Sequence, residues 1–436
     1  MDNSINTLLR LGMRKNSHAK LFDVIPAEVL EGHVLTLWQA QDKFYRQFPD
    51  ALGIDDIGAW KTWLTDGPLS KHDEDARDLI LVLADKLVKP VSEEMIPALT
   101  NNYLQQAMKM KLMDAIEKHN DPDNEIDMLD LVDQVRDDFK DKLERTTKSP
   151  IEDTSIDDLY AVEENNVGFK WRLPELGMCM RPLRPSDSII WAARPDRGKT
   201  TTVASEVSYM IPQMDQVYPG QNKTFIWFNN EGDSRAIRRR LYQAALGVTG
   251  SQMLEYHRDG TLLPRLHEAF GGKEMFDRIL VMSIHGYSSS QVLRLIKEHN
   301  PGLIVFDMVD NIRFNGLSTN GGTRTDQMLE EMYRWVRDHA NIDDYAAIST
   351  SQISGDGEDD AYPNMSMLKD SKTGKQGACE AIVMWGEKNS MPNARFLNTP
   401  KNKLCLEGMP MNPKCEVYFA PHIARVMSLE QAAEMQ

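Results

Sequence analysis

The sequence predicts a C-terminal α/β domain with a parallel sheet, preceded by an all-α N-terminal domain and a helical hairpin. From about residue 171 onward, short apolar runs typical of β-strands alternate with segments of helical spacing. Residues 1–145 show helical spacing only, and a segment poor in apolar residues separates the two regions. A chain of 436 residues is also long enough for two or three domains.

The N-terminal region has the apolar periodicity of packed helices. Val34, Leu35 and Trp38 illustrate the spacing, and no catalytic motif accompanies it, so we interpret this region as a packing or protein-contact domain. The hairpin that follows has a polar Asn-Asp-Pro-Asp-Asn turn between its two arms, 94–119 and 126–145. The expected divisions are a helical domain at 1–92, the hairpin at 93–145, a linker at 146–172 and the α/β domain at 173–436.

The composition limits both the class of protein and its compartment. A net charge of −16 argues against a protein that coats duplex DNA nonspecifically, although it allows a narrow basic track such as loops lining a pore. No apolar run approaches the ~20 residues of a membrane span, and the first residues lack a signal pattern. The four cysteines form no C-x-x-C pair and suit a reducing compartment. We therefore expect a cytoplasmic protein without a membrane partner.

A phosphate-binding loop is predicted where the apolar run 188–192 meets a helix-compatible run at 201–210. The loop ends in Gly-Lys-Thr, and Ala193 stands where the P-loop pattern usually has its first glycine. Backbone N–H groups of such a loop surround phosphates, Lys199 can reach the β and γ phosphates of ATP, and the Thr200 hydroxyl can bind Mg²⁺. The residues predicted to bind the nucleotide are Ala193, Arg194, Pro195, Asp196, Arg197, Gly198, Lys199, Thr200 and Thr201.

Three later strands are each predicted to end in a polar side chain, at the sheet edge where open α/β sheets bind ligands. Glu231 follows the strand at 225–228 and could polarise the water that attacks the γ-phosphate. Asp307 ends the strand at 301–307 in the Walker B manner and would hold Mg²⁺, with Asp310 as the less favoured alternative. Gln352 ends the strand at 345–351 and could sense the γ-phosphate.

Two loops after these strands carry basic residues that could hold single-stranded DNA. Lysines three positions apart in a loop can contact successive phosphates, and the alternative is an exposed, solvated loop. The run of three arginines at 238–240 falls on an amphipathic helix, and we interpret it as a solvated helical face. The first loop, 313–324, is the first candidate DNA segment, and the second, 354–377, is the second candidate DNA segment. The candidate DNA-binding residues are Arg313 and Arg324 in the first loop and Lys369, Lys372 and Lys375 in the second.

The order of these motifs resembles that of DnaB-type replicative helicases. The resemblance rests on Gly198-Lys199-Thr200-Thr201, Asn229-Asn230-Glu231, Val305-Phe306-Asp307, Ser351-Gln352 and Lys375-Gln376-Gly377, and it covers about 173–422. It extends more loosely to the helical domain and the hairpin, which match the architecture of the family. The short length and divergent sequence suggest a phage or plasmid version, which would work in the cytoplasm of a bacterial host.

The resemblance implies a RecA-like core that assembles into a ring, usually a hexamer, with ATP between subunits and single-stranded DNA in the channel. In that family a K-x-R pair reaches the ATP of the neighbouring subunit. Lys401 and Lys403 occupy these places here, so that a lysine replaces the arginine that stabilises transition-state charge. A helix near Ser155–Tyr160 would dock onto a neighbouring subunit. The acidic N-terminal half could bind a primase or a helicase loader.

The sequence therefore indicates an ATP-driven helicase that moves along single-stranded DNA, with Mg²⁺ as the metal. Glu231, Lys199, Gln352 and Lys403 are its candidate catalytic residues. Two alternatives remain open. A RecA-like recombination or repair ATPase would share the core but form filaments, and an ATP-gated loader or regulatory ATPase would hydrolyse ATP without unwinding DNA.

Overall fold

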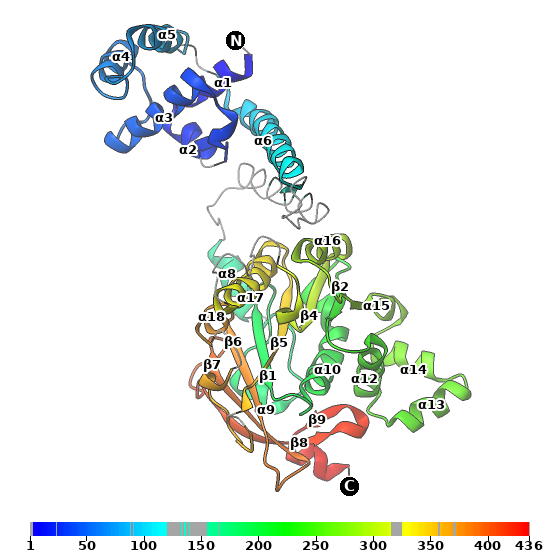
Figure 1. The fold of residues 1–436 in the computed structure, drawn as a ribbon. Coiled ribbons are helices and arrows are strands. Elements are labelled where there is room, and N and C mark those ends of the chain that lie inside the picture. The colour runs from blue at the N-terminus through cyan, green and yellow to red at the C-terminus, as the bar shows by residue number, and fades with distance from the viewer. Residues whose placement is uncertain are drawn as a thin grey trace. The chain divides into compact units, whose positions relative to one another are not determined.

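A computed structural model of the chain contains two compact units, Met1–Asp153 and Thr154–Gln436, which are described separately (Figure 1). Among the residues described, no helix combines the length and the apolar character needed to cross a membrane. The structure describes residues 3–22, 24–87, 89, 91–119, 132, 135–136, 139, 155–164, 166–314, 325–355, 358–368 and 372–435.

The N-terminal unit is helical, as predicted. Its core packs Leu8, Leu37, Trp38 and Trp60, each at most 2% exposed, so that the apolar spacing of the sequence becomes one buried cluster. The first arm of the expected hairpin is the helix α6, whereas most of the second arm lies outside the described residues. The helices are α1 (Asn3–Leu11), α2 (Lys15–Phe22), η1 (Ala27–Val29), α3 (Gly32–Gln47), α4 (Ile57–Asp66), α5 (Glu74–Asp85), η2 (Glu93–Met95) and α6 (Ile96–His119).

The second unit is built on a nine-stranded sheet of order β3-β2-β4-β5-β1-β6-β7-β8-β9. The strands from β1 to β6 run parallel, and β7, β8 and β9 continue the sheet in antiparallel pairs. This arrangement confirms the predicted α/β class. The strands are β1 (Ser188–Ala193), β2 (Thr224–Asn229), β3 (Ile279–Ser283), β4 (Pro301–Asp307), β5 (Ala346–Gln352), β6 (Ala381–Gly386), β7 (Ala394–Asn402), β8 (Lys414–Ala420) and β9 (Arg425–Met427).

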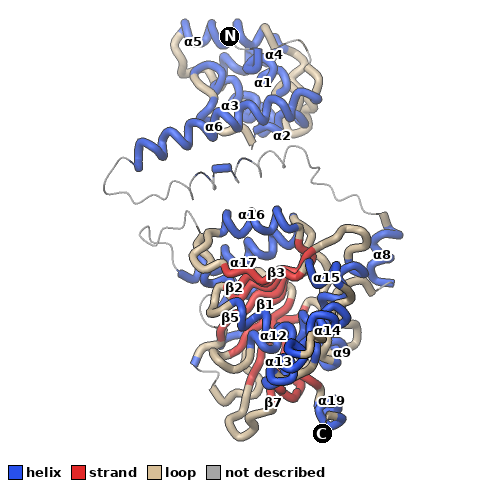
Figure 2. The backbone as a smooth tube through the Cα atoms, turned by 90° about the vertical axis from the view of Figure 1, so that its right-hand side faces the viewer, coloured by secondary structure: helices blue, strands red, loops and turns tan. Residues whose placement is uncertain are grey.

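Helices cover both faces of this sheet, which is why its central strands are apolar along their whole length (Figure 2). Alternate residues of one strand enter different cores: Trp191 packs with α10 and Ile190 packs on the face covered by α16 and α17. The helices of the first face include α9 (Pro174–Cys179), α10 (Lys199–Met210), η3 (Ile211–Gln213), α11 (Met214–Val217), α12 (Ser234–Leu246), α14 (Leu262–Ala269) and α15 (Lys273–Asp277), and those of the second are α16 (Ser289–His299) and α17 (Thr325–Ile342).

Several shorter elements complete the unit. Phe169 and Trp171 are buried in its larger core, so the chain contributes to this core from residue 169 onward. Part of the basic segment at 354–377 is also helical, because α18 begins at residue 372. The remaining elements are α8 (Ile156–Glu164), α13 (Gly250–Arg258), η4 (Val309–Asn311), η7 (Met365–Met367), α18 (Lys372–Gly377), η8 (Pro421–Ile423) and α19 (Leu429–Glu434).

Candidate nucleotide-binding site

The predicted P-loop is a tight turn between β1 and α10. Gly198 adopts a φ of 95°, a conformation that L side chains rarely adopt, and directly precedes the first residue of the helix. A Cβ at this position would lie 2.5 Å from the ring of Phe419. Glycine is therefore required both by the backbone and by the close approach of β8. The first N–H groups of α10 are left without carbonyl partners within the helix, as a phosphate-binding turn requires.

Side chains from distant strands hold the P-loop in place. The indole Nε1 of Trp385 donates a hydrogen bond to the carbonyl of Arg197 at 3.0 Å, and Arg395 donates to the same oxygen at 3.4 Å. The Arg197 guanidinium pairs with Glu387 at 3.0 Å. The Arg395 guanidinium also lies over the ring of Phe419, 4.5 Å from its centroid. Side chains of β6, β7 and β8 thus hold the loop in place.

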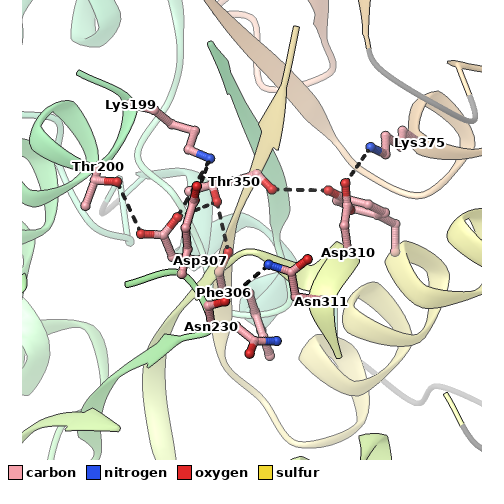
Figure 3. A network of polar contacts seen from close by, with 11 residues as sticks. Lys199, Thr200, Asn230, Phe306, Asp307, Asp310, Asn311, Thr350 and Lys375 are labelled. Atoms are coloured by element: carbon pink, nitrogen blue, oxygen red, sulfur yellow. Dashed lines mark hydrogen bonds and ion pairs between the residues drawn. The ribbon is translucent and has the colours of Figure 1, made fainter. Parts of the chain in front are cut away.

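Four predicted catalytic or metal-binding residues lie together where β1, β2 and β4 end, and Figure 3 shows three of them, Lys199, Thr200 and Asp307. The Lys199 ammonium lies 3.5 Å from Glu231 and 3.9 Å from Asp307. The Thr200 hydroxyl donates to Oδ2 of Asp307 at 3.3 Å. The register of β2 and β4 brings Glu231 near Asp307, because Asn229 pairs with Asp307 across these two adjacent parallel strands.

Asp307 is the buried acid of this group. Its side chain is 1% exposed, and burial raises the pKa of its carboxyl, while the Lys199 ammonium and the Thr350 hydroxyl oppose the rise. Thr350, which donates to Oδ1 of Asp307 at 2.7 Å, was not predicted, since a threonine inside a strand carries no sequence signal. A buried carboxylate beside the Thr200 hydroxyl supplies the oxygen ligands that Mg²⁺ prefers, so these residues fit the predicted metal.

A cavity of about 480 Å³ opens above these residues, large enough for a small ligand. Lys199 and Arg240 bring positive charge to it, which suits a phosphate-bearing ligand. Arg240 is exposed on α12, as expected of a solvated helical face, and it also lines this cavity. The cavity is lined by Arg194, Pro195, Asp196, Gly198, Lys199, Thr200, Thr201, Glu231, Gly232, Asp233, Ala236, Ile237, Arg240, Gln352, Phe419 and Pro421.

Other predicted site residues lie outside this lining. Ala193 is fully buried at the end of β1, and Arg197 turns toward Glu387. Lys401 and Lys403 do not line the cavity: the Lys401 ammonium donates to the carbonyl of Gln376, and Lys403 is exposed. No sequence motif pointed to Phe419, Pro421 or Asp233, which reach the cavity from β8, from η8 and from the N-cap of α12.

The candidate DNA-binding residues fall into different environments. Arg313 is exposed just after η4, whereas Arg324 and Lys369 lie outside the described residues and the side chain of Lys372 is not described. Lys375 requires a correction, because it does not project from an exposed loop. Its side chain is fully buried in α18, where its ammonium donates to Asp310 at 3.0 Å and to the Ser351 hydroxyl at 3.0 Å. An ammonium in this position cannot reach a phosphate chain at the surface.

Comparison with family models finds a similarity for part of the second unit. Residues 157–342 match a family model described as an AAA domain. This span contains the P-loop, Glu231 and Asp307, and so includes most of the site described above. A search of curated proteins finds no match to the chain.

Solved structures then identify the overall architecture. A DnaB-like replicative helicase, described with its interactions with primase, is 14% identical in sequence and superposes with a TM-score of 0.56. The match covers 98% of this chain and 100% of that one, which confirms the predicted resemblance for the fold, a helical N-terminal region followed by a RecA-like ATPase fold. An ATPase domain of another protein is 18% identical, with 64% of this chain and 100% of that chain covered and a TM-score of 0.49.

Proposed function

We propose that this chain is an ATP-dependent replicative DNA helicase, a ring-forming motor that moves along single-stranded DNA and unwinds duplex. The observation that carries the proposal is the convergence of Lys199, Glu231 and Asp307 at the strand ends, where Lys199 and Glu231 line the cavity and Asp307 is buried beside Lys199. A P-loop lysine, a carboxylate able to activate water and a buried metal-binding carboxylate together make up the machinery of phosphoryl transfer from ATP to water.

In the proposed reaction the chain positions the nucleotide and the attacking water. The P-loop N–H groups and Lys199 bind the phosphates, and Thr200 and Asp307 hold Mg²⁺, which neutralises charge on the phosphate oxygens. Lys199 now lies 3.5 Å from Glu231, so moving its ammonium to a phosphate would leave the carboxylate available. Glu231, whose side chain is 50% exposed, would then accept a proton from the attacking water. Gln352 lines the same cavity and would sense the γ-phosphate.

Self-assembly would complete each ATP site. Lys401 and Lys403 lie outside the cavity of their own chain and would act on the nucleotide of a neighbouring subunit. Helix α8 supplies a surface for such contact, because Ile156 and Tyr160, one turn apart, are 74% and 58% exposed. These features support a homo-oligomeric ring, and the family resemblance favours a hexamer.

The DNA and protein partners follow from the same proposal. Arg313, Arg324, Lys369 and Lys372 would contact the phosphates of a single strand inside the ring. The N-terminal unit would bind a primase or a helicase loader, in line with the interactions with primase described for the structural relative. The working compartment would be the cytoplasm, that of a bacterial host if a phage encodes the chain.

The proposal is tested by ATP hydrolysis with and without single-stranded DNA, together with unwinding of a forked duplex. We expect Glu231→Gln to lower turnover by about 10²–10⁴-fold, the usual effect of losing a positioned base. Lys199→Ala should abolish turnover by removing the phosphate contact. Lys273→Ala provides the control, because this exposed lysine pairs with Asp277 on α15.

Each rival function has its own outcome in these assays. Unimpaired hydrolysis in both site variants would reject the site assignment. Hydrolysis by the unaltered protein without strand displacement, even with partner proteins supplied, would favour a loader or regulatory ATPase. Images of filaments in place of closed rings would favour a recombination or repair ATPase.

A further inference from the structure

A buried ion pair lies next to the nucleotide site but outside its cavity. The ammonium of Lys375 donates to Oδ2 of Asp310 at 3.0 Å (Figure 3). It also donates to the hydroxyl of Ser351 at 3.0 Å. It also lies over the ring of Tyr333, 5.0 Å from the centroid. The lysine side chain is fully buried and that of Asp310 is 17% exposed.

A buried ion pair contributes little net stability to a fold. Removing two charges from water costs about as much as their attraction returns, and apolar residues of similar volume often stabilise as well or better. Neighbouring positions on this side of the sheet are filled by apolar side chains, including Met332, Val336 and Ile353. A purely structural role therefore gives no reason for charge at these two positions.

The position of the pair in the chain suggests what the charge does. Asp310 lies in η4, three residues after Asp307, and the chain then continues through Arg313 into the first candidate DNA segment. Lys375 lies in α18, at the end of the second candidate DNA segment. The ion pair consequently joins the residues just before the first segment to the last residues of the second, although the two segments are far apart in sequence.

The same pair contacts the strand that reaches the nucleotide. Ser351, which accepts a hydrogen bond from Lys375, lies in β5 between two residues of the ATP site. On one side, Thr350 donates to Asp307 at 2.7 Å, and its carbonyl accepts a hydrogen bond from Tyr333 at 3.1 Å. On the other side, Gln352 lines the cavity. A displacement of β5 by the nucleotide would therefore move the Ser351 hydroxyl that accepts a hydrogen bond from Lys375.

Two further contacts extend this connection. Asn311, next to Asp310, donates to the carbonyl of Asn230 at 3.2 Å, beside Glu231 at the end of β2. The Lys401 ammonium donates to the carbonyl of Gln376, next to Lys375. The residues flanking the ion pair are thus hydrogen-bonded to the residue before the predicted base on one side and to Lys401 of β7 on the other.

We propose that Asp310 and Lys375 are positioning residues that couple the nucleotide state to DNA affinity. The ion pair clamps η4 to α18 and to β5, so that η4, just before the first candidate DNA segment, and α18, at the end of the second, shift together when nucleotide acts on the strand ends. This inference rests on the proposed function, and it gives Lys375 a role different from direct contact with phosphates.

The test uses the double variant Asp310→Asn with Lys375→Met in the full chain. Removing one partner alone would leave an unpaired buried charge, whereas the double change removes both charges and nearly keeps both volumes. DNA affinity is measured with and without a non-hydrolysable ATP analogue, alongside DNA-free hydrolysis and the thermal unfolding midpoint. The matched control is Arg181→Met with Asp187→Asn, which removes another partly buried ion pair of the same unit, with an N–O distance of 2.6 Å.

We expect the double variant to retain DNA-free hydrolysis and to lose the effect of the analogue on DNA affinity. The ratio of the two affinities should fall about 5-fold or more, the usual range of a coupling between two sites. The control pair should leave this ratio unchanged. A double variant of normal stability that keeps the full ratio would overturn the inference.

A second measurement covers the case in which the double variant fails to fold. Amide hydrogen exchange in the unaltered protein is followed at 311–314 and 372–377 with and without the analogue. Protection should change in both segments together, and a change in only one of them would reject the clamp. If the unaltered protein shows no DNA binding at all, the proposed function itself fails, which is a separate result.

Discussion

The hydroxyl of Thr200 lies 3.3 Å from a carboxylate oxygen of Asp307, although 107 positions separate the two residues. β1 leads into the helix that carries the threonine, and β4 ends in the aspartate, with β5 between these two strands in the sheet. Parallel strands deliver their carboxyl ends to the same edge, so residues from separate loops meet there. The candidate metal ligands are therefore set by sheet order.

Asp307→Asn should remove the dependence of nucleotide binding on Mg²⁺. The substitution takes away the buried carboxylate beside Thr200, while Lys199 and the P-loop remain to bind phosphates. Affinity for an ATP analogue, measured by calorimetry with and without Mg²⁺, should become the same in both conditions. Because burial raises the pKa of Asp307, the neutral amide should not lower the unfolding midpoint.

The control for this variant is Asp233→Asn, a change in an exposed carboxylate on the same cavity. It should retain the response to Mg²⁺. An Asp307→Asn protein that responds to Mg²⁺ like the unaltered one would move the metal site elsewhere.

Gly198→Ala should weaken nucleotide binding and lower stability. A positive φ costs an L residue about 1–2 kcal/mol, and the new Cβ would also lie 2.5 Å from the ring of Phe419. Gly220 provides the matched control, because it has a φ of 73° and a Cβ added there would meet no atom within 4 Å. Thermal unfolding should show a larger loss for Gly198→Ala than for Gly220→Ala, and only the first should lose ATP-analogue affinity. Equal losses would mean that the contact with Phe419 is unimportant.

Lys403→Ala should inactivate the site of a neighbouring subunit and not its own. Glu231→Gln inactivates the site in which it lies, so neither variant hydrolyses ATP at a normal rate alone. When the two are mixed and reassembled, some interfaces combine an intact Glu231 with an intact Lys403. Hydrolysis by the mixture should therefore exceed the sum of the separate rates. A purely additive rate would argue that Lys403 does not act across an interface.

The stability of the second unit should depend on Glu206 at mildly acidic to neutral pH. This carboxyl of α10 is fully buried, and burial raises its pKa from the ordinary value of 4.5 to about 7, although the Arg172 backbone and charge oppose the rise. A raised pKa favours the protonated form in the folded state. Its stabilising contribution is thus complete below 4.5 and is lost as the pH rises through about 7.

Glu206→Gln should remove this component of the pH dependence. The unfolding midpoint of the variant should rise relative to that of the unaltered protein as the pH increases from 4.5 to 7, and the difference should level off above that range. Parallel profiles for the two proteins would contradict the assignment to Glu206. Thermal unfolding followed by circular dichroism is sufficient to distinguish these outcomes.

Local patterns in the sequence were sufficient to predict much of the fold of the second unit. Apolar runs predicted strands because a strand covered on both faces must be apolar along its length, and Gly-Lys-Thr after such a run predicted the turn between β1 and α10. Glu231 and Asp307 were predicted from their positions after strands. These inferences depend on residues that are close together in the chain.

The residues that the sequence did not reveal are those whose role depends on distant partners. Trp385 and Arg395 hold the carbonyl of Arg197 from almost 200 positions away, and Phe419 closes on Gly198 from β8. Lys375 is the clearest case. Its sequence context, with glycine, serine and other lysines, is that of an exposed loop, and only the packing of α18 against α17 and β5 places its ammonium beside Asp310 and Ser351.

The sequence by itself determined the class of the fold, the P-loop and the acidic residues at the strand ends, because periodicity and short motifs are properties of neighbouring residues. The tertiary structure decided which of these side chains share a cavity and which charges are buried. Sheet order and packing determine this, because they bring together residues such as Asp310 and Lys375, which are 65 positions apart. Burial then determines whether a lysine is available to a ligand or committed to a partner inside the protein.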